Sequence, residues 1–104
     1  MADETAAQTR RRMPAIGKWR PAGALRDGWL ILRTEHYEQT GVEQWLTIAR
    51  AMQITGPLRV VSITLDGGGQ MGCSSDPADG FEFFTRTPAE ALRAAKCAAS
   101  GATR

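Results

Sequence analysis

Residues 58–74 read LRVVSITLDGGGQMGCS, and this stretch decides the fold. From Arg59 to Leu65 the side chains alternate with a period of two, which is typical of a strand with one face on a core. Gly67, Gly68 and Gly69 then supply a turn that is free of side-chain constraint, and Gln70 to Ser74 can return as a second strand. The stretch therefore predicts a β-hairpin.

Two further elements are expected after this hairpin. Residues 81–85 contain three phenylalanines behind a polar, turn-forming connection, which favours a third strand with Phe81 and Phe83 pointing inward. Thr87–Glu90 has the spacing of a capping box, with a proline at the first helical position. This pattern predicts a helix through Ala99, whose small side chains allow close packing on a sheet.

The segment before the hairpin carries a second capping-box pattern at Thr40–Glu43. Apolar residues follow it at helical spacing and predict an amphipathic helix that ends at Thr55-Gly56-Pro57. Residues 29–34 favour a strand, although a helix capped by Asp27 stays open as an alternative.

These elements predict an α+β domain over residues 27–100, with residues 101–104 frayed. Two helices are expected to cover one face of a small three- to four-stranded antiparallel sheet, in the order (β)αβββα. The expected core comprises Trp45, Leu46, Met52, Val61, Ile63, Leu65, Phe83 and Leu92. The opposite face is expected to expose some of Trp29 or Ile31, Val60 and Phe84, and an apolar sheet face or edge invites a partner or a second copy.

Length and composition suggest one folded domain that does not span a membrane. The chain has 104 residues, of which 42% are hydrophobic and 23% are charged, as in average folded proteins. The longest apolar run is Trp29 to Leu32, far below the roughly 18 residues that suggest a membrane span. Met1–Thr5 carries acids where a secretory signal is basic. We therefore expect a cytoplasmic protein.

The first 26 residues differ in charge from the rest of the chain. They hold six basic and two acidic residues, so this segment carries +4 and the remainder −2 of the total of +2. Proline and glycine interrupt any helical or strand period, so residues 1–26 are expected to form a flexible basic arm. Cations and an aromatic residue suit nucleic acid or an acidic partner, and the candidate contacts are Arg10, Arg11, Arg12, Lys18, Trp19 and Arg20. The alternative is a solvated tail with Trp19 docked on the core.

Two apparent ligand motifs have ordinary structural explanations. Gly67, Gly69 and Gly72 match the spacing G-x-G-x-x-G, but residues 73–77 cannot open the helix that a dinucleotide site needs. The acidic group Asp66, Asp76, Asp79 and Glu82 lacks the spacing of a calcium loop, and its members are common turn formers. We expect no cofactor and no metal.

Catalysis is a remote alternative. His36 is the only histidine, and with Cys73 and Asp66 or Asp76 it can supply a base, a nucleophile and an orienting acid. No local pattern supports this set. Cys73 and Cys97 are expected to be separate reduced thiols, with a disulfide between them left open.

For function, the sequence favours a small non-enzymatic interaction or regulatory protein that acts through protein–protein contact. The partner is unknown, and self-association through the sheet face or edge is included. A nucleic-acid-binding module that uses the basic arm is the alternative.

Overall fold

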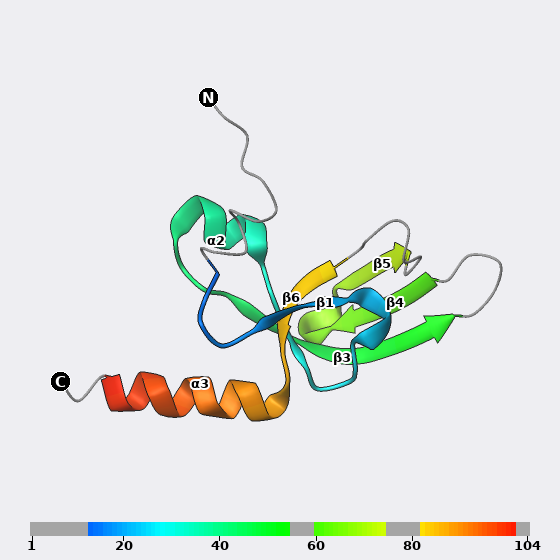
Figure 1. Ribbon diagram of the computed structural model, residues 1–104. Coiled ribbons are helices and arrows are strands. Elements are labelled where there is room, and N and C mark those ends of the chain that lie inside the picture. The colour runs from blue at the N-terminus through cyan, green and yellow to red at the C-terminus, as the bar shows by residue number, and fades with distance from the viewer. Residues whose placement is uncertain (1–12, 55–59, 75–81, 102–104) are drawn as a thin grey trace.

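The computed structural model describes residues 13–54, 60–74 and 82–101 (Figure 1). Within these residues the chain forms one six-stranded antiparallel sheet and two α-helices. The expectation of a mixed α+β domain is confirmed, and that of a three- to four-stranded sheet in the order (β)αβββα is wrong. The strands, in the spatial order β1-β6-β2-β3-β4-β5, are β1 (Lys18–Pro21), β2 (Leu30–Leu32), β3 (Trp45–Ile54), β4 (Val60–Leu65), β5 (Gln70–Ser74) and β6 (Glu82–Arg86).

The predicted hairpin is confirmed. Strands β4 and β5 pair antiparallel from Val60 opposite Ser74 to Thr64 opposite Gln70. The turn between them contains the 3-10 turn η2 (Asp66–Gly68), in which Gly67 and Gly68 have φ angles of 82° and 89°. These left-handed values explain why the turn uses glycine.

The prediction of a helix after Thr40 is wrong, because residues 45–54 form β3, the longest strand described. Thr40 instead ends the short helix α2 (Thr34–Thr40), with its hydroxyl donating to the His36 carbonyl oxygen at 2.8 Å. Gly41 closes that helix at a φ of 72°. Strand β3 pairs with β2 in its first part and with β4 in its second. This pairing outweighs the helical spacing of its apolar residues.

Part of the segment expected to be a flexible arm belongs to the sheet. Strand β1 pairs with β6 along its length, from Lys18 opposite Thr85 to Pro21 opposite Glu82. The following 3-10 turn η1 (Ala22–Ala24) and its neighbour Leu25 enter the core, where Ala22 and Leu25 are buried. Proline is compatible with β1 because the strand lies at an edge of the sheet.

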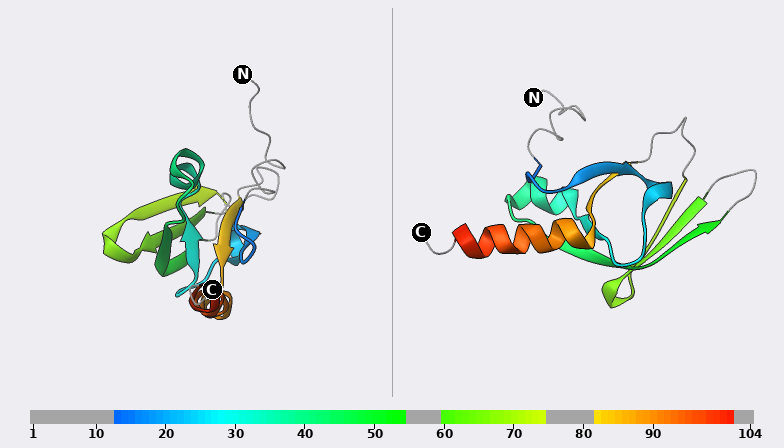
Figure 2. Two further views of the ribbon diagram at one scale, coloured as in Figure 1. Left: turned by 90° about the vertical axis from the view of Figure 1, so that its left-hand side faces the viewer. Right: turned by 60° about the horizontal axis from the view of Figure 1, so that its bottom comes forward.

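The sheet has an apolar cluster on each face. The inner cluster contains the buried residues Ala22, Leu25, Ile31, Ile48, Val61, Ile63 and Leu65, and the outer cluster contains Met13, Leu32 and Phe84. Figure 2 shows how the sheet curls, with β1 and η1 bent over β3 and β4. A register shift in β3 between Ile48 and Arg50 lies in this bend, as bulges increase the local twist.

The core predictions were partly right. Val61, Ile63 and Leu65 are buried as expected, whereas Trp45, Leu46 and Phe83 are half-buried. Met52 and Leu92 were wrongly assigned to the core, because their side chains are 40% and 58% exposed. Phe84 and Ile31, which are expected on the exposed face, are both buried. Phe84 belongs to the outer cluster, and Ile31 belongs to the inner cluster, which also contains Ala22 of η1. Phe81 and the side chain of Val60 lie outside the described part.

Gly17 gives a test of the packing over β6. Its φ is +155°, and a Cβ at this position would lie 2.5 Å from a ring carbon of Phe84. Because Phe84 is buried in the outer cluster, the ring has little room to move, and Gly17→Ala is expected to cost about 1–3 kcal/mol of unfolding free energy. Urea denaturation measures this cost. Gly41→Ala is the control, since its Cβ would meet no atom within 4 Å although its φ of +72° also favours glycine. Equal losses in the two variants would contradict the predicted clash.

Candidate functional site

Helix α3 (Pro88–Gly101) begins at the capping box that the sequence predicts. The Thr87 hydroxyl accepts a hydrogen bond from the Glu90 backbone N–H at 3.2 Å, and a Glu90 carboxylate oxygen accepts one from the Thr87 backbone N–H at 2.7 Å. The two bonds satisfy donors that a helix start otherwise leaves open. From this point α3 leaves the end of β6 and extends away from the sheet (Figure 1).

Arg20 of the edge strand β1 contacts the first turn of this helix. One of its terminal nitrogens donates to Glu90 at 2.8 Å, and the other lies 3.2 Å from the Thr85 carbonyl oxygen. Its guanidinium also lies over the Trp29 ring, 4.9 Å from the ring centre. The side chains of Arg20 and Glu90 are only 15% and 12% exposed. A half-buried charge-assisted bond of this kind holds both partners in place.

The same contacts set the acidity of Glu90. Burial raises the pKa of this carboxyl, but hydrogen bonds from Thr87 and Arg20, together with the Arg20 charge, outweigh burial and hold the pKa below its ordinary value. Glu90 is therefore ionised in the folded protein at neutral pH.

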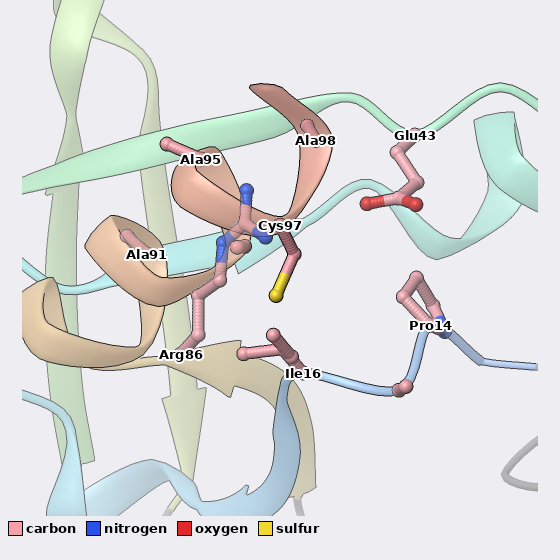
Figure 3. Close-up of a pocket in the computed structure, with 10 residues that line it drawn as sticks. Pro14, Ile16, Glu43, Arg86, Ala91, Ala95, Cys97 and Ala98 are labelled. Atoms are coloured by element: carbon pink, nitrogen blue, oxygen red, sulfur yellow. The ribbon is translucent and has the colours of Figure 1, made fainter. Parts of the chain in front are cut away.

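A groove of about 340 Å³ lies between α3 and the segment before β1. Four alanines at helical spacing, Ala91, Ala94, Ala95 and Ala98, form its wall on the α3 side, and Pro14, Ala15 and Ile16 line the other side. Figure 3 shows the Cys97 sulfur and the Glu43 carboxylate pointing into the space between these walls. Cys97 carries a free, exposed thiol.

Two charged side chains complete the groove. Arg86, the last residue of β6, stacks on Trp45 with its guanidinium carbon 3.8 Å from the ring centre. The Trp45 ring N–H donates to a Glu43 carboxylate oxygen at 2.8 Å. Burial lowers the pKa of Arg86, while the charges of Glu43 and Glu90 act in the opposite direction. The groove thus combines a small apolar wall with one cation and one anion.

The predicted contact residues of the basic arm are placed in different surroundings. Arg10, Arg11 and Arg12 lie outside the described residues. Lys18 is exposed on β1, whereas Trp19 packs edge-on against Phe84 with ring centres 5.6 Å apart. Arg20 makes the structural contacts with Glu90 and Thr85. The described part of this set therefore does not form one exposed basic surface.

The residues of the remote catalytic alternative lie on separate elements. His36 is on α2 and Cys73 is on β5, and Figures 1 and 2 place these elements at different parts of the sheet. Asp66 belongs to η2, while Asp76 and Asp79 lie outside the described residues. In the part of the chain that the structure describes, no three His, Cys, Asp or Glu side chains gather as metal ligands would.

A second cavity, of about 330 Å³, opens on the inner side of the sheet. Its apolar lining includes Ile31, Leu46, Met71 and Phe83. It adjoins β5 and β6, and residues 75–81, which connect these two strands, lie outside the described part. The groove beside α3 is therefore the better-defined candidate.

Sequence reasoning located α3 but not the groove. Arg86 and Glu43 come from segments far apart along the chain, and only the signal at Thr87–Glu90 pointed to the start of the helix. Comparison of the chain with protein-family models, with curated proteins and with solved structures finds no match. None of the helices in the described ranges is both long and apolar enough to cross a membrane.

Proposed function

We propose that this protein is a non-enzymatic interaction protein that binds a slender segment of a partner protein in the groove beside α3. The observation that carries the proposal is the alanine wall formed by Ala91, Ala94, Ala95 and Ala98. This stripe faces residues 14–16 across about 340 Å³ of space. An apolar helical face normally packs against another surface, and here the groove separates it from the segment opposite.

The dimensions of the groove favour an extended or helical peptide with small side chains. Alanine adds only one carbon to the backbone, so a peptide can approach α3 closely. The groove is partly open to solvent, which suits a segment that continues beyond it. Such a role requires no catalytic group, and a cytoplasmic location is part of the proposal.

Nucleic-acid binding through the basic arm is less well supported. It would use Trp19 and Arg20, and these two side chains have contacts within the fold. Self-association through the sheet is also less well supported, because Phe84 and Ile31 are buried instead of exposed.

Selection of peptides from a random linear library displayed on phage tests the proposal. Ala94→Trp fills the groove and is expected to lower the affinity for the selected peptides by at least about tenfold. This corresponds to a loss of about 1.4 kcal/mol of binding free energy. Ala98→Trp is a second blocking variant, farther along the helix. Thermal unfolding of each variant checks that the fold is intact.

Ala89→Trp is the matched control, because Ala89 is exposed on α3 and does not line the groove. It is expected to change peptide affinity by less than about twofold. A library that yields no binding peptide, or peptides that bind the Ala94→Trp and Ala98→Trp variants as well as the wild type, would refute the proposal. Sedimentation of a dimer that Ala94→Trp disrupts would assign the groove to a second copy and would also refute it.

A further inference from the structure

We infer that the partner segment binds this groove through a carboxylate, which Arg86 recognises while it is stacked on Trp45. This inference rests on the proposed function and adds the chemistry of the partner. It identifies an acidic side chain flanked by small apolar residues as the feature that the groove selects.

Arg86 is held in place at the wall of the groove. Its guanidinium is stacked on Trp45 at 3.8 Å, which fixes its plane, and the residue lines the groove between Glu43 and the alanines of α3. A planar guanidinium that is already held in place loses little freedom on binding, and its N–H groups match the two oxygens of a carboxylate.

The charges of Glu43 and Glu90 act on Arg86, but neither carboxylate is hydrogen-bonded to it within the described residues. The Nε atom of Arg86 is buried and has no hydrogen-bond partner within the described residues. Glu43 accepts from Trp45, and Glu90 accepts from Arg20 and Thr87, so both carboxylates are engaged with other donors. The terminal N–H groups of Arg86 also make no hydrogen bond within the described residues, so they are available to an acceptor that enters the groove.

The charge of Glu43 limits the type of anion that the groove can bind. Glu43 points into the same groove and would repel a group with two negative charges more strongly than a group with one. The remaining lining is mostly alanine, proline and isoleucine, which offers no further cation. One carboxylate beside small apolar side chains fits this lining better than a phosphorylated residue.

The test uses the peptides selected from the phage library, each paired with versions in which one Asp or Glu at a time is replaced by Asn or Gln. We expect one acid-to-amide change per peptide to weaken binding to the wild-type protein by at least about tenfold. Arg86→Gln is expected to cause a similar loss for the acidic peptide and little further loss for the amide version. Arg86→Lys keeps the charge but loses the planar guanidinium. Its affinity for the acidic peptide is expected to lie between those of the wild type and the Arg86→Gln variant.

Arg93→Gln is the control for the loss of a positive charge, because Arg93 is exposed on α3 and does not line the groove. It should leave the difference between acid and amide peptides unchanged. If the selected peptides bind in the groove but tolerate the acid-to-amide change, the carboxylate inference is wrong and the proposed function stands. The same conclusion follows if Arg86→Gln weakens acid and amide peptides equally. If no groove-binding peptide is selected, the proposed function itself fails.

Discussion

Ile48→Ala is expected to lower the free energy of unfolding by about 3–4 kcal/mol, the typical cost of emptying a well-packed core position. Ile48 has no exposed surface and belongs to the inner cluster. Its backbone N–H donates to the Trp29 carbonyl oxygen at 2.7 Å, and its carbonyl oxygen accepts from Gly28 at 2.8 Å. The side chain therefore sits at a fixed point of the bend in β3 and cannot easily be replaced by its neighbours.

Ile54→Ala is the matched control, since it removes the same atoms from the same strand at a position that is 48% exposed. It should cost less than about 1 kcal/mol. Urea denaturation followed by tryptophan fluorescence measures both variants. Similar losses at the two positions would contradict the packing of β3 described above, and a helix over residues 45–54 would have to be reconsidered.

Glu90→Ala is expected to destabilise the protein by about 3 kcal/mol. The substitution leaves the largely buried Arg20 guanidinium and the Thr87 N–H without their acceptor. Removing one partner of such a pair costs more than the pair contributes. In a double-mutant cycle with Arg20→Met, the double variant is expected to lose less unfolding free energy than the two single variants together. The expected difference is about 1–3 kcal/mol. Additive losses would show that the two side chains act independently.

The contribution of Glu90 also depends on pH in a defined direction. Its pKa lies below the ordinary value of 4.5, so its charged form stabilises the fold. The stability difference between the wild type and Glu90→Gln should be constant above about pH 5 and should shrink as the pH falls through the lower pKa of the folded state. Urea denaturation between about pH 7 and pH 3 measures this difference. A difference that grows on acidification would contradict the assignment.

The sequence predicts those parts of the fold whose signals are local. The hairpin of β4 and β5 is set by alternation and by three consecutive glycines, and α3 is set by the capping box at Thr87. Both signals lie within a few residues of the element they define, and neither depends on distant contacts.

The missed elements depend on pairing between distant segments. The apolar residues of β3 fit a helical face, but hydrogen bonding to β2 on one edge and β4 on the other selects a strand. The prolines and glycines before residue 26 predict flexibility, but Pro21 lies in an edge strand, where a missing backbone N–H is tolerated. Strand β1 forms because it pairs with β6, which lies more than 60 residues later in the chain.

The candidate site was missed for the same reason. Arg20 was assigned to nucleic-acid contact on the basis of local charge, while its main partner, Glu90, is 70 residues away. No local pattern marks Arg86 or Glu43 in the sequence, because only the folded chain brings them together in one groove. Local charge patterns do not show which basic residues are already paired.

NMR spectroscopy of the labelled protein tests most directly whether the groove beside α3 binds an acidic peptide segment. On titration with a selected acidic peptide, we expect the largest shifts at the backbone amides of Ala91, Ala94, Ala95 and Ala98 and at the side-chain Nε–H of Arg86. Shifts concentrated on the exposed side chains of β3, such as Met52 and Ile54, with the Arg86 signal unchanged, would contradict binding in the groove.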